Sequence, residues 1–271
     1  MIKLILTDVD QTILPKGDKV VPARTLAALD AALAAGIHVG PASGRALPGI
    51  IPTFGGEARY VQTALATNGM QVYLDGELIH EEHLDRDGLV HVVEVARTLE
   101  GVGVICFEDS SIVHIVCGEL DDLATSFPAY AADPRFDDEV PAFPIVKSNI
   151  FVRGDMERTA EVLEIFKREV PELGFNLPLA GFLNVTPVGY SKANGIDIMC
   201  DALGIDLSEV VVFGDGGNDI EMLEHVPNSV AVANATPEVT RIACWHIGSC
   251  ADEAVADAIF ALAEGAFPFT E

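Results

Sequence analysis

Residues 2–12 read IKLILTDVDQT, a short apolar run followed at once by two aspartates. The aliphatic side chains of Ile2–Leu6 predict a short buried strand. Because side chains at positions i and i+2 of an extended segment point the same way, we expect Asp8 and Asp10 to face one site. Neighbouring carboxylates resist ionising together, and a divalent cation removes that conflict. Taken alone, the two aspartates are equally consistent with a polar turn.

A second acidic loop follows another apolar run near the end of the chain. Val210–Phe213 predicts a buried strand, and the sequence GDGGND at 214–219 comes directly after it. A helix cap explains one acid of this loop but not both. The candidate metal ligands are therefore four aspartates, and oxygen ligands favour Mg²⁺: Asp8, Asp10, Asp215 and Asp219.

Strands and helices alternate at both ends of the chain. Pro22–Ala35 has leucines at helical spacing, and residues 37–39 and 60–66 are apolar runs that predict the second and third strands. Helix and strand patterns alternate again after residue 185. This order predicts an α/β fold with a doubly wound, Rossmann-like parallel sheet, which places ligands at the carboxyl ends of its strands.

The alternation is interrupted in the middle of the chain. Asp75-Gly76 predicts a two-residue hairpin turn, and residues 82–182 then show a mixed order of helices and paired strands. We therefore expect a core domain made of residues 1–81 and 183–271. Residues 82–182 are expected to form an inserted α+β domain.

The composition excludes several classes of partner. Sixteen Lys and Arg against 42 Asp and Glu give a net charge of −26, which argues against nucleic acid or an anionic membrane as a partner. No apolar run approaches the length of a membrane span, and no signal peptide is recognisable. Five cysteines without a C-x-x-C pair fit a reducing, cytoplasmic location. No pattern indicates an oligomeric state.

Two further polar residues are candidates for phosphate binding. Ser43 follows the second predicted strand, so its hydroxyl lies at the same sheet edge, although a helix N-cap is the better interpretation of Ser43 in isolation. Lys192 stands near the start of a helix where the chain returns to the core. Its ammonium could bridge a phosphoryl oxygen and Asp8, whereas a solvated surface lysine is the simpler interpretation of Lys192 alone.

Together these residues resemble the haloacid dehalogenase superfamily of phosphohydrolases, and the resemblance spans essentially the whole chain. The first motif of the family is D-x-D-x-T, the second a Ser or Thr, the third a Lys and the fourth G-D-G-x-N-D. The matching residues are, in chain order, Asp8, Asp10 and Thr12, then Ser43, then Lys192, then Gly214–Asp219. Thr67-Asn68-Gly69 resembles a loop of the Cof-type subfamily, which carries a large α/β cap where the inserted segment lies here.

The resemblance implies a mechanism. Asp8 would attack the phosphorus of a small phosphomonoester to form an aspartyl-phosphate, and Asp10 would protonate the leaving oxygen and then activate water. Mg²⁺ would be held by Asp8, the Asp10 backbone carbonyl and Asp215, with Asp219 assisting directly or through water. The cap would close over the site and select the substrate. The residues expected to contact the substrate phosphate are Thr12, Ser43, Gly44, Lys192 and Asn218.

The chain departs from the family pattern at two positions. Gln11 stands where the family usually has Gly, so it would be strained if that position requires a positive φ. The third motif reads Lys192-Ala193-Asn194-Gly195-Ile196 instead of K-G-x-A-L. Two alternatives therefore stay open beside a phosphatase of sugar phosphates or phosphorylated cofactors. One is a phosphomutase or phosphotransferase on the same scaffold, and the other is a non-catalytic phosphate-binding homologue.

Overall fold

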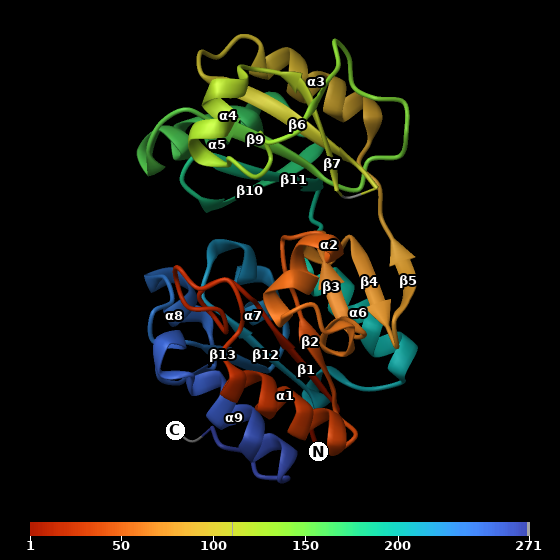
Figure 1. The fold of residues 1–271 in the computed structure, drawn as a ribbon, viewed down its shortest axis with the longest axis vertical. Helices are drawn as coiled ribbons and strands as arrows, with labels where there is room; N and C mark the ends of the chain where they lie inside the picture. The colour runs from red at the N-terminus through yellow and green to blue at the C-terminus, as the bar shows by residue number, and fades with distance from the viewer. Residues whose placement is uncertain (110, 270–271) are drawn as a thin grey trace. The chain divides into compact units, whose positions relative to one another are not determined.

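The computed structural model describes residues 1–109 and 111–269, which divide into two units (Figure 1). The first unit contains Met1–Glu81 and the described residues from Ser191 onward, and the second contains Glu82–Tyr190. The first unit is therefore assembled from both ends of the chain. Within the described residues, no helix is both long enough and apolar enough to cross a membrane.

A five-stranded parallel sheet forms the centre of the first unit, in the order β14-β13-β12-β1-β2. The first strand, β1, lies between β12 and β2, so that Leu4 is opposite both Val210 and His38. This order confirms the α/β class and the parallel sheet. The strands of the sheet are β1 (Leu4–Thr7), β2 (His38–Pro41), β12 (Val210–Gly214), β13 (Asn228–Ala231) and β14 (Trp245–His246).

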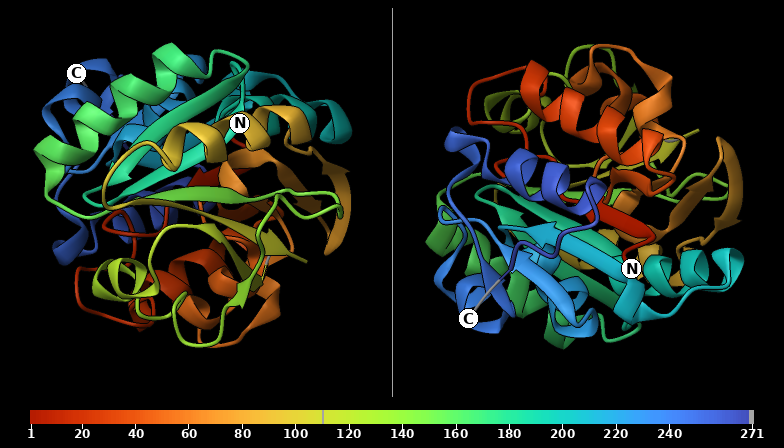
Figure 2. Two further views of the ribbon diagram at one scale, coloured as in Figure 1. Left: turned by 90° about the horizontal axis from the view of Figure 1, so that it is seen from above. Right: turned by 90° about the horizontal axis from the view of Figure 1, so that it is seen from below.

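Helices cover both faces of this sheet because the side chains of β1 alternate between them. Ile5 packs in the cluster that contains Leu29 and Ile259, whereas Leu4 and Leu6 pack in a second cluster with helices α6, α7 and α8. Helices α1 and α9 lie side by side, as the right-hand view of Figure 2 shows. The helices of this unit are α1 (Ala23–Ala34), α2 (Leu47–Ile50), α6 (Lys192–Leu203), α7 (Ile220–His225), α8 (Pro237–Ile242) and α9 (Ala254–Ala263).

The predicted third parallel strand at residues 60–66 is wrong in its extent, and its parallel pairing is reduced to a single bridge between Leu65 and Ala42, which follows β2. Only β3 (Ala64–Ala66) is a strand, and it pairs antiparallel with β4 (Gln71–Leu74) in a separate sheet that β5 (Glu77–Glu81) completes. The preceding residues form a short 3₁₀-helix, Ala58–Val61. The Asp75-Gly76 hairpin is confirmed, with positive φ angles at both residues. The run is apolar because it is buried, and the short loop Thr67–Met70 brings its partner β4 back beside it.

The second unit is a six-stranded sheet with the order β10-β11-β9-β6-β7-β8. Neighbouring strands are antiparallel except β7 and β8. Helices α3 and α5 contact each other and the sheet, whereas α4 packs in a separate cluster against β6, β7 and β9 (Figure 2). The elements are α3 (Arg86–Ala96), β6 (Val102–Glu108), β7 (Ile112–Cys117), α4 (Leu120–Ser126), β8 (Arg135–Phe136), β9 (Ser148–Val152), α5 (Met156–Glu169), β10 (Leu173–Leu179) and β11 (Phe182–Pro187).

The expected boundary after residue 182 falls inside this sheet. Strand β11 lies between β10 and β9, with Asn184 opposite both Asn176 and Asn149. Residues 183–190 therefore belong to the second unit and not to the core. The apolar pattern marks β11 as a strand, but its partners are distant in sequence and the pattern carries no information about them.

Candidate active site

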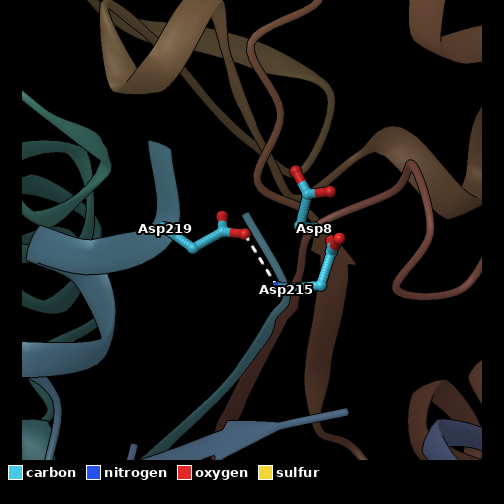
Figure 3. Close-up of side chains that lie close together, drawn as sticks. All are labelled: Asp8, Asp215 and Asp219. Carbon is cyan, nitrogen blue, oxygen red and sulfur yellow. Dashed lines mark hydrogen bonds between the residues drawn. The ribbon is translucent and has the colours of Figure 1, made fainter. Parts of the chain in front are cut away.

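Three aspartates from two neighbouring strand ends converge at one point (Figure 3). The chain leaves β1 at Asp8 and β12 at Asp215, and the Asp8 N–H donates to the Phe213 carbonyl at 2.9 Å. Carboxylate oxygens of Asp8, Asp215 and Asp219 lie within 4.8 Å of one another, and all three residues are buried. The parallel pairing of β1 with β12 thus joins two acidic loops that are far apart in sequence.

Asp219 is held in place by the backbone of its own loop. Its Oδ2 accepts hydrogen bonds from the N–H groups of Asp215 and Gly216, each at 3.0 Å. Gly214 makes this close approach possible, because a Cβ on residue 214 would lie 2.7 Å from the Asp219 Cβ. The glycines around Asp215 therefore serve the position of Asp219, directly before α7.

The Lys192 ammonium lies between two of these carboxylates. It donates to Asp8 Oδ1 at 2.7 Å and to Asp219 Oδ1 at 2.6 Å, and the side chain is fully buried. Lys192 is the first residue of α6, whose N-terminus is capped by Ser191 and Asn194 in a reciprocal capping box. The interpretation of Lys192 as a solvated surface residue is therefore wrong.

The four charged groups perturb one another. Burial raises the pKa of the Asp8 carboxyl well above its usual value, and Lys192 opposes that rise. Burial and the nearby Asp219 raise the pKa of Asp215 to about 7. Burial lowers the pKa of the Lys192 ammonium, but Asp219 and Asp8 more than compensate and keep it above its usual value. Three carboxylates against one ammonium leave an excess of negative charge that a cation would balance.

The donor set fits a hard divalent cation. All available ligand atoms are carboxylate oxygens, which suit Mg²⁺. Both oxygens of Asp219 are already engaged, one by Lys192 and one by two backbone amides. In the part of the chain that the structure describes, Asp8 Oδ2 and Asp215 Oδ2 accept no hydrogen bond. These two oxygens are the ones open to a metal ion.

Thr12 and Asp10 come from the same loop but differ in their surroundings. Thr12 is buried, and its hydroxyl donates to Asp215 Oδ1 at 2.7 Å, which orients that carboxylate. Asp10 is half exposed, and both of its oxygens accept from Arg45, Oδ2 from Nε at 2.8 Å and Oδ1 from a terminal nitrogen at 2.6 Å. The Asp10 carboxylate is therefore outside the cluster of three aspartates.

The backbone between these two residues adopts a left-handed conformation. Gln11 has φ +63°, which is uncommon for a residue with a Cβ. The Gln11 carbonyl accepts from the Asn234 amide at 2.8 Å, and the Asn234 Oδ1 accepts from the Cys250 N–H at 2.8 Å. The position usually occupied by glycine in the family thus does require a positive φ here, and Asn234 helps to hold the strained residue.

Ser43 lies in a buried turn beyond β2. Its N–H donates to the Leu65 carbonyl at 2.8 Å, and its Oγ accepts from the Arg45 N–H at 3.2 Å. Among the described residues, nothing accepts the Ser43 O–H, which remains available as a donor. Asn218 donates from Nδ2 to Asn68 Oδ1 at 3.2 Å, and that oxygen also lies 3.1 Å from where a Cβ on Gly44 would stand.

The Thr67-Asn68-Gly69 loop joins this group and is strained. Its three residues have φ angles of +51°, +56° and +87°, and the buried hydroxyl of Thr67 has no hydrogen-bond partner in the described chain. The backbones of Gly69 and Gly195 are in close contact, and a Cβ on Gly195 would lie only 3.0 Å from the Gly69 Cα. Gly195, the departure from the usual third motif, is thus required by close packing of α6 on this loop.

Two contributions were missed at the level of sequence. Arg45 follows Ser43 by two residues, which placed it at the right sheet edge, but its pairing with Asp10 has no local signature. Asn68 was noticed only as part of a resembling loop, and its contact with Asn218 joins residues from opposite ends of the chain.

Comparison with known proteins agrees with this geometry. A family model for haloacid dehalogenase-like hydrolases matches residues 5–259. The chain belongs to this family. It is thus a hydrolase of the phosphatase and phosphotransferase type, as its motifs predicted.

Individual relatives align with this hydrolase over nearly its whole length. It is 29% identical over 278 aligned positions to the Escherichia coli 5-amino-6-(5-phospho-D-ribitylamino)uracil phosphatase YbjI, covering 100% of this chain and 99% of that protein. A sugar phosphatase of subclass IIB has the same fold, with a TM-score of 0.81 and 23% identity over 96% of this chain and 98% of that one. A phosphatase-superfamily protein from Bacteroides thetaiotaomicron has a TM-score of 0.78 with 23% identity, covering 96% and 94% of the two chains.

Proposed function

We propose that this hydrolase is a Mg²⁺-dependent phosphatase that hydrolyses a small phosphorylated metabolite through an aspartyl-phosphate on Asp8. The observation that carries the proposal is the position of Asp8. Asp8 lies at the end of β1, accepts a hydrogen bond from the fully buried Lys192, and has the carboxylates of Asp215 and Asp219 beside it. A carboxylate so placed can serve as a covalent nucleophile.

In the first step, an Asp8 oxygen forms a bond to phosphorus while the bond from phosphorus to the leaving oxygen breaks. Asp10 supplies the proton that the leaving oxygen takes up. In the second step, Asp10 takes a proton from water, whose oxygen attacks phosphorus. The bond between phosphorus and Asp8 then breaks, which releases inorganic phosphate and restores the free carboxylate.

The remaining polar groups stabilise the negative charge on the oxygens of the transferred phosphoryl group. Lys192 and the free O–H of Ser43 are the proposed donors to its oxygens, together with the backbone N–H of Thr12, with Gly44 and with Asn218. Lys192 also opposes the rise in the pKa of Asp8 that burial causes. Mg²⁺ would be held by Asp8 and Asp215, with the Asp10 carbonyl and with Asp219 acting through water, and would neutralise charge on the substrate phosphate.

The substrate class remains that of small phosphomonoesters. The names of the relatives support it, since one is a phosphatase of a phosphorylated ribitylamino-uracil and another a sugar phosphatase. We further propose that the second unit, Glu82–Tyr190, is the cap domain of this subfamily, and that the enzyme acts in the cytoplasm.

The test measures phosphate release from 4-nitrophenyl phosphate and from a panel of phosphorylated sugars and cofactors, with Mg²⁺ and with EDTA. Asp8→Asn is expected to abolish turnover, and Asp18→Asn, at an exposed position of the same N-terminal segment, is the matched control. Turnover that persists in Asp8→Asn would exclude this nucleophile. Adding free sugars as acceptors distinguishes hydrolysis from phosphotransfer.

A further inference from the structure

The second unit holds a buried lysine that no part of the proposed reaction uses. Lys147 precedes β9, is 5% exposed, and its carbonyl accepts from the Phe107 N–H, which continues the pairing of β9 with β6. Its ammonium lies 4.6 Å from the centre of the Phe107 ring and 5.4 Å from that of Tyr130, and it donates to the Tyr130 hydroxyl at 3.2 Å.

This ammonium has no carboxylate partner among residues 1–109 and 111–269. Burying a charge without an opposite charge is unfavourable, and the aromatic rings compensate for only part of the loss. The contrast with Lys192 is direct, because that equally buried ammonium has two carboxylates. An anionic group from outside the chain would complete the surroundings of Lys147.

A row of asparagines crosses the sheet beside Lys147. Asn149 on β9, Asn184 on β11 and Asn176 on β10 stand opposite one another in register. Asn149 donates to Asn184 Oδ1 and Asn184 donates to Asn176 Oδ1, each at 2.8 Å. Asn149 is 1% exposed, and its Oδ1 is a buried acceptor with no hydrogen-bond partner in the described chain.

The Lys147 ammonium and the Asn149 Oδ1 lie on one face of the sheet. Lys147 and Asn149 are two positions apart along one extended segment, so their side chains point the same way, with about 7 Å between their backbones. Lys147 packs over Phe107, which shares a cluster with Ile105, and Ile105 pairs with Asn149. One group offers N–H donors on a positive charge, and the other offers an acceptor.

We propose that Lys147 and Asn149 form a binding site for a small hydroxylated acid, with the anionic oxygen on Lys147 and a hydroxyl donating to Asn149 Oδ1. A sugar acid carries both kinds of group. The ligand is either the leaving group of a substrate or a free molecule that binds the second unit, and the kinetic test below distinguishes the two. Binding itself does not depend on the proposed phosphatase activity.

The binding test is calorimetric titration of the full chain with gluconate, which carries a carboxylate and hydroxyls. Sorbitol and acetate each lack one of these features and should bind about tenfold more weakly or worse, because one charge-assisted or neutral hydrogen-bond set is lost. Lys147→Met keeps the length of the side chain without its charge and should weaken gluconate binding at least about tenfold. Lys167→Met is the matched control, on an exposed lysine of α5 in the same unit.

A second variant, Asn149→Asp, tests the site independently in case Lys147→Met does not fold. Asn149→Asp preserves shape, gives Lys147 an internal partner and repels an anion, so it should also weaken gluconate binding. Absence of binding to the native chain, or equal affinity in Lys147→Met and the native chain, would overturn the proposal.

Kinetics then distinguish the two sources of the ligand. If the site receives a leaving group, Lys147→Met raises KM for 6-phosphogluconate about tenfold and leaves 4-nitrophenyl phosphate unaffected, because only the former carries the acid. If the ligand is a free molecule, gluconate binding is lost in the variant while both substrates are unaffected. A native chain without phosphatase activity that still binds gluconate through Lys147 would contradict the proposed function alone.

Discussion

Arg45 donates a hydrogen bond to each carboxylate oxygen of Asp10, from Nε at 2.8 Å and from a terminal nitrogen at 2.6 Å. The two residues follow different strands, β2 and β1, so the pair ties together two loops at one edge of the sheet. Two parallel hydrogen bonds fix the orientation of a carboxylate far better than one. The proposed general acid and base is thus held in one orientation by a residue outside the motifs.

Arg45→Lys should therefore lower kcat by about tenfold or more, because a lysine keeps the charge but loses the two-point contact that orients Asp10. KM should change less, and the pH profile of kcat should move, since Asp10 carries the protons. The measurement is the pH dependence of turnover. Arg59→Lys is the control, as Arg59 pairs with the exposed Asp30 in the same unit. An unaltered profile would mean that Arg45 does not orient Asp10.

Lys192→Met should destabilise the fold by roughly 3–5 kcal/mol, because it leaves Asp8 and Asp219 buried without their counter-charge. Urea unfolding in EDTA measures the loss. Combining it with Asp219→Asn should recover part of the stability, since one of the uncompensated charges is then removed. A double variant less stable than the single one would contradict this account of the charges.

Thr12→Val should weaken Mg²⁺ binding by about 10–100-fold, because hydrogen bonds to metal-binding carboxylates orient them. The shape of the side chain is kept, and the Mg²⁺ concentration at half-maximal activity is the readout. Thr53→Val removes a buried hydroxyl bonded to the Ile50 carbonyl and controls for stability alone. Equal Mg²⁺ requirements in the two variants would exclude a role for Thr12 in orienting Asp215.

Gln11→Gly should stabilise the protein by roughly 0.5–1 kcal/mol, since Gln11 has φ +63° and glycine adopts this conformation without a steric penalty. Thermal or urea unfolding provides the measurement. Gln62→Gly is the control and should destabilise the protein. Gln62 has an ordinary φ of −65°, so glycine there only adds freedom to the unfolded chain. Destabilisation by both substitutions would show that Gln11 is not strained.

Stabilisation by Mg²⁺ should increase with pH. The pKa of Asp215 is about 7 in the folded chain against a usual 3.8, so the metal-free fold binds this proton more tightly than the unfolded chain. Its stability therefore falls as the pH rises from about 4 through 7. A bound cation favours the ionised form, so the Tm difference between Mg²⁺ and EDTA should be larger at pH 8 than at pH 5.5. Asp215→Asn should flatten this dependence.

The acidic site was predictable because both of its acidic loops directly follow apolar strands. Asp8 and Asp215 end neighbouring parallel strands, and such ends meet in any sheet of this class. Lys192 could be placed only by resemblance, since a lysine at a helix start is ordinarily solvated. Its burial depends on the packing of α6 against the loop at Gly69, which no local pattern shows.

The pairing of strands was the part that escaped prediction. β3 is as apolar as a central strand, yet it pairs in a small antiparallel sheet because the hairpin that follows supplies its partner. The predicted domain boundary cut through β11, whose partner β9 is distant in sequence. In both cases the side-chain pattern identifies a strand but not its neighbour.

The central position of β1 has a consequence for biosynthesis. Leu4 pairs with Val210, so at translation rates of about 5–20 residues per second the first strand waits roughly 10–40 s for its neighbour. Glu82–Tyr190 is contiguous and can fold during that delay. The nascent chain therefore carries an open, aliphatic strand edge on the ribosome until most of its length has been made.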